Sequence, residues 1–211
     1  MRELIERYVR ELVKIPSTSN TETEKSCADY IAEELAKQPY FKEYPEQTGK
    51  YLLPEDSFGR SVPWGLVKGR NGSRKTIILT GHYDVVDTEE YGNERALAYD
   101  VEKWENLVKS GNALPGMPEE VKEDFLSGEW MFGRGTADMK GGLSVGLALL
   151  DWYGKLVVEA ERKDCGTAAF ETKTASGTEE TPEISGNLLF VTVPDEEGYS
   201  AGMRGAVPFL N

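Results

Sequence analysis

Residues 77–87 read IILTGHYDVVD, and this stretch decides the fold class. It begins within the run TIILT, which is short, unbroken and rich in β-branched residues. Such a run is typical of a strand buried on both faces of a parallel sheet. A second run of the same kind, LLFVTV, occupies residues 188–193. The sequence therefore predicts a sheet with at least these two strands in its interior.

Helices are predicted on both sides of these strands. Apolar residues recur at helical spacing before the first strand, and Thr21 with Glu24 fits a capping box at the start of the second helix. The alternation of helices and strands predicts an α/β fold, a three-layer α/β/α sandwich with a mostly parallel central sheet. The predicted helices cover 4–15, about 22–37, 101–108, 118–125 and 139–153, a further strand covers 62–67, and a mobile surface loop covers 161–187.

Composition limits the classes of function. The chain has 211 residues and a formal net charge of −13, which argues against a nucleic-acid partner because such proteins carry basic patches. Its first residues are charged throughout and it has no long apolar run, so neither a signal peptide nor a membrane partner is expected. Cys27 and Cys165 are far apart and predict two free thiols. We expect a soluble cytoplasmic protein.

Polar residues that suit a metal site follow both buried strands. His82, the single histidine of the chain, and Asp84 follow the first strand, and Glu196 and Glu197 follow the second. Asp138 lies in the glycine-rich turn GRGTADMKGG, directly before an apolar helix. Ligands of open α/β sheets bind beyond the carboxyl ends of the strands, so we expect these residues at one edge.

The residue types in these groups have a chemistry in common. Zn²⁺ binds imidazole nitrogen and carboxylate oxygen, and a pair of zinc ions needs a bridging carboxylate, for which Asp138 is suitable. His82 and Asp84 point the same way on an extended chain, so Asp84 can orient the imidazole ring. Of the paired glutamates, one can hold metal while its neighbour acts as a base on water.

Each group also has an ordinary interpretation. A single histidine after a strand is often structural, and Asp138 could serve as the N-cap of the helix that follows. The run Asp195, Glu196 and Glu197 could be a solvated charge cluster. The three groups favour a site because they occur together, in this order, after buried strands.

The segments TGHYDVVD, GRGTADMKGG and DEEGYSAGM resemble those of the aminoacylase, acetylornithine deacetylase and carboxypeptidase family of di-zinc hydrolases. Because a long acidic stretch separates the first two segments, the chain most resembles the arginine-utilisation protein branch of that family. The resemblance extends over nearly the whole chain. It implies a zinc-peptidase-like catalytic domain that hydrolyses amide bonds of N-acylated amino acids or small peptides.

The resemblance also implies a role for each residue. His82 and Glu197 would be ligands to different zinc ions, and Asp138 would bridge the two. Glu196 and Asp84 would be the catalytic pair, Glu196 as the general base and Asp84 as the residue that orients His82. The implied cofactor is Zn²⁺, two ions in a complete site, with Co²⁺ or Mn²⁺ as possible substitutes.

The sequence departs from the family pattern in what it lacks. The family supplies a further carboxylate and a second histidine after the paired glutamates, and it inserts a lid or dimerisation domain. Neither is found in residues 1–211, which therefore resemble the N-terminal part of the catalytic domain alone. We expect such a chain to bind zinc weakly, to be inactive by itself, and to expose apolar surface that favours a homo-oligomer.

Other functions remain open at this stage. The chain could be a non-catalytic α/β binding module that keeps the metal-site motifs, since it has a single histidine. A serine or cysteine nucleophile lacks support, because there is no GxSxG motif and neither cysteine has a nearby histidine. GRGTADMKGG does not match a phosphate loop. The acidic segment 88–130 suggests a cationic substrate, compatible with arginine metabolism.

Overall fold

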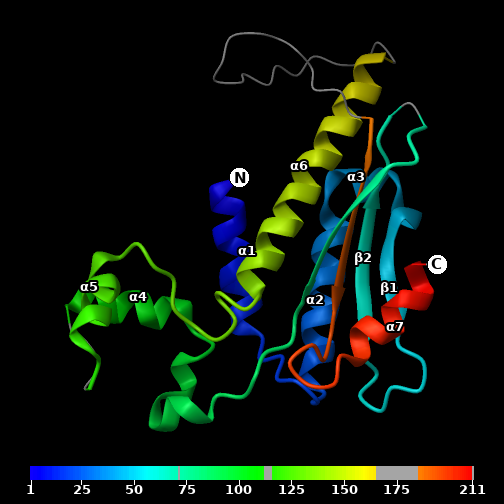
Figure 1. The fold of residues 1–211 in the computed structure, drawn as a ribbon. Helices are drawn as coiled ribbons and strands as arrows, with labels where there is room; N and C mark the ends of the chain where they lie inside the picture. The colour runs from blue at the N-terminus through cyan, green and yellow to red at the C-terminus, as the bar shows by residue number, and fades with distance from the viewer. Residues whose placement is uncertain (71, 112–115, 165–184, 211) are drawn as a thin grey trace.

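The computed structural model describes residues 1–70, 72–111, 116–164 and 185–210. Over these residues the chain forms a four-stranded sheet with helices packed on it (Figure 1). The elements are α1 (Arg2–Lys14), α2 (Thr23–Lys37), α3 (Pro39–Glu43), η1 (Pro45–Gln47), β1 (Thr48–Leu52), β2 (Ser61–Val67), β3 (Thr76–His82), η2 (Glu89–Leu97), α4 (Val101–Ser110), α5 (Glu119–Ser127), α6 (Lys140–Asp164), β4 (Asn187–Val193) and α7 (Ala201–Leu210).

The sheet is mixed, with the strand order β1-β2-β4-β3. β3 and β4 are parallel and place His82 opposite Val193, whereas β1 pairs with β2 and β2 with β4 in antiparallel fashion. The predicted mostly parallel sheet is therefore wrong, although the α/β class is confirmed. The connection 53–60 between β1 and β2 is short. It permits antiparallel pairing, whereas parallel pairing would require a crossover of a dozen or more residues.

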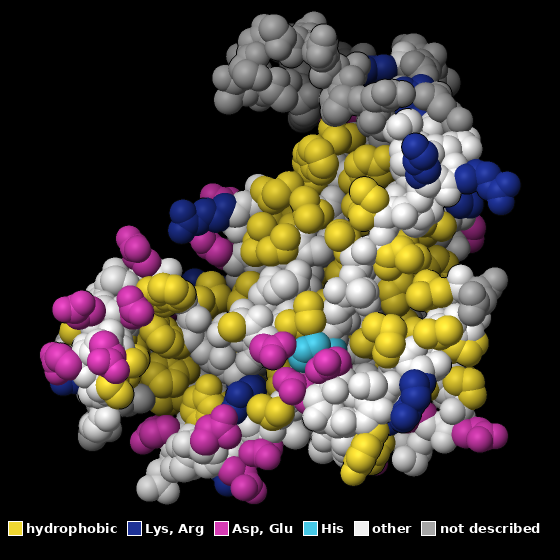
Figure 2. Space-filling view, in the orientation of Figure 1, with side chains coloured by type: hydrophobic (Ala, Val, Ile, Leu, Met, Phe, Trp, Pro, Cys, Tyr) yellow, Lys and Arg dark blue, Asp and Glu magenta, His cyan; other side chains and the backbone are white. Residues whose placement is uncertain are grey.

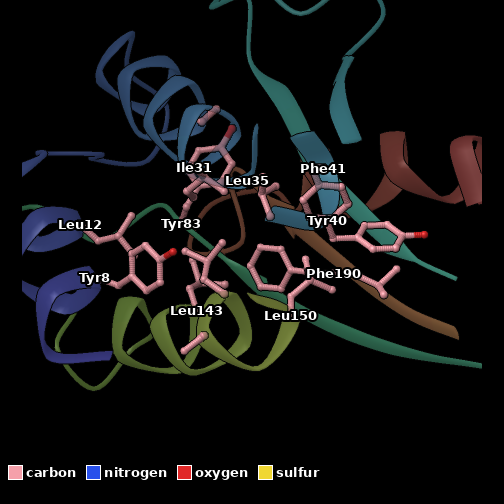
Figure 3. Packing of buried hydrophobic residues seen from close by; sticks show 14 of the residues in the cluster. Tyr8, Leu12, Ile31, Leu35, Tyr40, Phe41, Tyr83, Leu143, Leu150 and Phe190 are labelled. Carbon is pink, nitrogen blue, oxygen red and sulfur yellow. The ribbon is translucent and has the colours of Figure 1, made fainter. Parts of the chain in front are cut away.

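The main core lies between one face of the sheet and helices α1, α2, α3 and α6 (Figure 3). Leu143 and Leu150 of α6 pack here with Phe190 of β4, and Leu12 and Ile31 bring in α1 and α2. The opposite face is covered over β2 and β4 by α7, whose Ala206 joins a smaller core with strand residues. Helices on both faces confirm the predicted three layers.

Strand β3 lies at the edge of the sheet and is exposed. Ile77 and Ile78, which point to opposite faces, are 66% and 51% exposed. The prediction that this run is buried on both faces is wrong for the described residues, because β3 is the border strand and the described helices leave Ile77 and Ile78 uncovered. Figure 2 shows hydrophobic side chains gathered over the neighbouring α6, where Val145 and Trp152 are exposed.

The acidic segment forms η2, α4 and α5, which lie beside α1 rather than on the sheet (Figure 1). Trp104 and Phe125 form a small core there, and Val101 packs against Val9 and Val13 of α1. The predicted helices at 101–108 and 118–125 are thus confirmed within two residues at each end.

Two sequence predictions fall partly outside the described residues. The helix predicted to end at Tyr153 continues to Asp164, and residues 165–184 of the predicted loop, with Cys165, lie outside the described part. Cys27 is a buried free thiol. In the described ranges, no helix combines the length and apolar character that crossing a bilayer requires.

Candidate metal centre

The parallel pairing of β3 and β4 brings the predicted site residues to one end of the sheet. His82 is the last residue of β3 and lies beside Val193, the last residue of β4. The ladder continues one step further, since the Tyr83 N–H donates to the carbonyl of Val193 at 3.0 Å. The chain then turns at Asp195, so that the paired glutamates return towards His82. The sequence positions 82 and 196 therefore become neighbours.

His82 is buried and is held through both ring nitrogens. Its Nδ1 lies 3.0 Å from the backbone carbonyl of Asp84 and 3.5 Å from the Asp84 carboxylate. Since a carbonyl can only accept, Nδ1 carries a proton. Nε2 lies 2.9 Å from Asp138 Oδ1 and 3.8 Å from Glu196 Oε2. Nε2 is thus the nitrogen that faces the acidic groups and is available to a metal.

Asp84 is fully buried and its carboxylate binds the turn that carries the glutamates. Oδ1 accepts the N–H of Glu196 at 3.0 Å, and Oδ2 accepts the N–H of Glu197 at 3.1 Å. Oδ2 also accepts the Ser19 hydroxyl at 2.6 Å. Asp84 therefore contacts His82 on one side and the glutamates on the other, which fits the predicted orienting residue.

Three groups that could ligate a metal lie close together among the described residues. One ligand atom each from His82, Asp138 and Glu197 lies within 4.8 Å of the others. Asp138 lies two residues before the start of α6, and Met139 holds the position before the helix, so the N-cap interpretation of Asp138 is wrong. The Asp138 side chain is 75% exposed and that of Glu196 is 55% exposed, so both reach solvent. Figure 2 shows acidic side chains around the one histidine.

The electrostatics of the site follow from this crowding. Burial lowers the pKa of His82, but the hydrogen bonds and charges of Asp84 and Asp138 outweigh it and raise the pKa to about 9. Burial raises the pKa of Asp84, yet its bonds with His82, Ser19 and the glutamate backbone bring it below the ordinary value. The pKa of Glu197 is raised by partial burial and by the neighbouring carboxylates, against the opposing effect of His82. Excess negative charge thus faces a protonated imidazole, and a divalent cation would take the place of the proton on Nε2, which is released to solvent.

The donor set fits a divalent metal. One imidazole nitrogen and two carboxylate oxygens converge, and the buried Asp84 supports the imidazole from behind, as ligating histidines require. Glu196 adds a carboxylate near the same nitrogen. The described residues therefore offer ligands for one divalent metal.

No family model matches the sequence. The chain is 31% identical to Protein RocB of Bacillus subtilis (strain 168) over 209 residues, which cover 99% of this chain and 32% of RocB. The chain is therefore similar in sequence to part of RocB. It is also 36% identical over 200 residues to the Uncharacterized protein YqjN of the same organism, covering 94% of this chain and 30% of YqjN.

The chain spans about a third of the length of these relatives. Its fold is similar to that in the crystal structure of human carnosine dipeptidase 1, with a TM-score of 0.57 and 15% identity, covering 98% of this chain and 35% of that chain. This similarity confirms the α/β fold that the resemblance implied.

Two residues near the site were missed by sequence reasoning. Ser19 binds Asp84, and Glu24 binds the backbone of Asp195. The sequence predicts a capping box of Thr21 and Glu24, but α2 begins at Thr23 and its N-cap residue, Glu22, makes no side-chain cap bond. The available signal is the helical spacing of Glu24 with the apolar residues Cys27 and Ile31, which places this glutamate on the buried side of α2.

Proposed function

We propose that this chain carries part of the active site of a metal-dependent hydrolase that cleaves amide bonds in N-acyl amino acids or small peptides. The observation that supports it most is the convergence of His82, Asp138 and Glu197 beside Glu196. Zn²⁺ suits this mixture of nitrogen and oxygen donors, and Co²⁺ or Mn²⁺ can replace it. His82, Asp138 and Glu197 would hold the metal, with Asp138 as the bridging ligand when two ions are present.

A bound zinc would supply Lewis acidity towards the scissile carbonyl and lower the pKa of water. The residues of the chain do the remaining work. Glu196 is exposed and lies beside the ligands, where its carboxylate takes the proton of the attacking water and passes it to the leaving amine. Asp84 holds His82 and the backbone of both glutamates, so the base and the ligand keep a fixed separation.

The 211-residue chain by itself carries an incomplete set of ligands in this proposal. It contains a single histidine, so two metals would share His82, Asp138 and Glu197. Catalytic zinc sites commonly use three protein ligands for one ion. We therefore expect weak zinc binding and no measurable hydrolysis of N-acyl amino acids by this chain.

Neighbouring glutamates give a matched test of the roles. Zinc titration by calorimetry should show that Glu197→Gln weakens binding at least tenfold, because a ligand is lost, whereas Glu196→Gln changes it less than threefold. The two variants alter the same turn by the same chemistry, so each is the control for the other. Equal losses would contradict the separate roles, and two tight zinc sites in the unaltered chain would contradict the incomplete site.

A second candidate function is a non-catalytic α/β module that binds one metal or a partner. The single histidine of the chain favours it. The two candidates differ in their dependence on Glu196, which only hydrolysis requires. Glu196→Gln in a longer RocB homologue that has amidase activity should abolish turnover, and full turnover in that variant would favour the module.

The acidic segment supports a cationic substrate, and this rests on the hydrolase proposal. Figure 2 shows acidic side chains on the surface formed by η2, α4 and α5. A negative surface near a site attracts positively charged ligands and raises their association rate. Neutralising Glu119, Glu120, Glu123 and Asp124 in a longer homologue should lower kcat/KM for arginine-containing substrates more than for neutral ones. An unchanged preference would remove the idea.

The exposed apolar side chains of β3 and α6 support a homo-oligomer as partner, besides the small-molecule substrate. Ile77, Ile78, Val145 and Trp152 are exposed there. Contiguous exposed apolar surface commonly marks an interaction site. Sedimentation velocity over a tenfold concentration range should show self-association, and a single monomeric species throughout would contradict it.

A further inference from the structure

Residues 195–200, here called the glutamate turn, connect β4 to α7 and carry Glu196 and Glu197. The turn begins at Asp195, a non-glycine residue with a left-handed φ of 59°. Its carbonyl accepts the N–H of Ser200 at 2.6 Å, and its Oδ2 accepts the N–H of Ala201 at 2.9 Å. Asp195 therefore closes the turn and fixes the start of α7.

Three successive N–H groups of this turn donate to buried carboxylates from distant parts of the chain. Those of Glu196 and Glu197 donate to Asp84, as described above. That of Asp195 donates to Glu24 Oε2 at 3.0 Å. Glu24 and Asp84 thus hold the backbone of the turn from two sides, and the glutamate side chains remain free to face His82.

Glu24 is itself held by a buried ionic network. It is fully buried on α2, where Oε1 accepts the N–H of Asn20 at 2.7 Å and Nη1 of Arg60 at 3.2 Å. Arg60, directly before β2, also donates to Asp56 at 2.6 and 2.9 Å. Its Nη1 lies 3.5 Å from Asp195 Oδ1, an atom with no hydrogen-bond partner among the described residues. One guanidinium therefore faces carboxylates of both Glu24 and the turn.

A network of this kind is a weak source of net stability. Removing charges from water offsets most of their attraction, and apolar side chains of similar volume often stabilise a core as well. What the network supplies here is position, since it ties α2 and β2 to the residue directly before the glutamate pair. A base and a metal ligand on adjacent residues need their backbone held to within about 0.5 Å.

We propose that Glu24, held in place by Arg60, is a positioning residue for Glu196 and Glu197. It touches neither metal nor substrate and acts through the backbone of Asp195. The inference rests on the proposed function for the purpose of the turn, but the positioning itself does not require metal or activity. It predicts that loss of Glu24 loosens the glutamate turn locally, before the sheet is affected.

Amide hydrogen exchange of the ¹⁵N-labelled chain without metal tests the positioning. In Glu24→Gln, the amides of Asp195, Glu196 and Glu197 should exchange at least tenfold faster than in the unaltered chain, relative to the amides of β4. Glu34→Gln is the matched control: Glu34 is a buried carboxylate on the same helix, paired with Arg7 and Lys37 away from the turn. It should leave that ratio within twofold.

Protected turn amides in a folded Glu24→Gln chain would overturn the proposal, as would equal acceleration in Glu34→Gln. If Glu24→Gln does not fold, Arg60→Lys decides by the same ratio, because lysine cannot reach Asp56, Glu24 and Asp195 together. Cobalt absorption spectra then link the turn to the site. Co²⁺ should bind Glu24→Gln at least tenfold more weakly than Glu34→Gln, and equal affinities would overturn the positioning of the ligand.

The two proposals fail in different ways. An unaltered chain that binds no Co²⁺ would contradict the metal site, while the exchange ratio would still decide whether Glu24 positions the turn. Normal Co²⁺ binding with an unchanged exchange ratio would overturn the role of Glu24 and leave the metal site intact.

Discussion

Two sets of carboxylates meet where β3 and β4 end, and they differ in exposure and in partners. Glu24, Asp84 and Asp195 are buried and accept hydrogen bonds from backbone N–H groups. Asp138 and Glu196 are largely exposed and face the imidazole of His82. Carboxylates thus have two different roles within one site. The buried set, Glu24, Asp84 and Asp195, holds the backbone of the site, and we call it the frame. The exposed set remains available to a ligand.

The largest expected effect concerns the stability of the frame. Asp84→Ala would remove the acceptor of the glutamate N–H groups and of the Ser19 hydroxyl, and would leave a charged His82 without its buried partner. We expect a loss of about 3–5 kcal/mol in the free energy of unfolding. Urea denaturation measures it. The comparison variant, Asp138→Ala, should lose less, about 1 kcal/mol, because this side chain is 75% exposed and gives up one hydrogen bond to His82. Equal losses of unfolding free energy in the two variants would contradict the different roles of the buried and exposed carboxylates.

For metal affinity we expect the opposite order: the exposed Asp138 should matter more than it does for stability. Asp138→Asn removes a proposed ligand while retaining size, so we expect Co²⁺ affinity to fall about 100-fold, equivalent to ~2.7 kcal/mol. Titration followed by absorbance measures the change. Asp124→Asn, at an exposed position on α5, should leave affinity unchanged. The ligand role of Asp138 would be contradicted by similar affinities in the two variants.

The buried Glu24 should make the stability of the chain depend on pH. Burial raises its pKa from the ordinary value of 4.5 to about 7, against the opposing effect of Arg60. The folded chain then binds a proton that the unfolded chain has released, so stability from this group falls as pH rises between about 4.5 and 7. Glu24→Gln should lose that dependence. Relative to the unaltered chain, its free energy of unfolding should rise by on the order of 2 kcal/mol across the window.

Glu34 gives a control of opposite sign for this pH dependence. Burial raises its pKa, but Lys37 and Arg7 outweigh burial and lower it. Stability from Glu34 is therefore present above its unfolded pKa and is lost as the solution becomes more acidic. Urea denaturation at a series of pH values compares Glu24→Gln with Glu34→Gln. Parallel slopes in the two variants would contradict the raised pKa of Glu24.

The smallest expected effect on stability lies on the strands that carry the site. β4 is covered near its end, whereas Ile78 of β3 is half exposed. Ile78→Lys should change the free energy of unfolding by less than about 0.5 kcal/mol and should reduce self-association, because lysine on an edge strand opposes strand pairing. Sedimentation velocity and urea denaturation measure both, with Ile78→Val as the apolar control. A stability loss well above 1 kcal/mol would mean that this side chain belongs to the core.

The sequence predicted much of the candidate site because strand ends and local motifs carry that information. Residues that follow two buried-looking strands had to meet if the strands were parallel neighbours, and β3 and β4 are. The roles of His82, Asp138, Glu196 and Glu197 as ligands and base stay predictions. What the motifs could not reveal is how the turn is held, since Glu24 and Asp195 are 171 positions apart and no local pattern connects them.

The sheet itself was predicted less well, for a physical reason. The run TIILT has the same composition whether its edge is paired or open, so the sequence gives no sign that β3 lies at the border of the described sheet. The strand β1, TGKYL, lacks a strong apolar pattern and owes its pairing to β2. Tertiary context, rather than propensity, decides such strands.

The open edge of β3 has a consequence for the affinity of the site. His82 is the last residue of this strand, which is hydrogen-bonded to β4 on one side over its described length. Any segment that pairs with the other side would restrict the strand and the imidazole at its end, and so favour metal binding. Because coupling between two binding events is reciprocal, metal at His82 would strengthen that pairing to the same degree. If the site binds metal as proposed, its affinity would therefore report on whether the edge of β3 is paired.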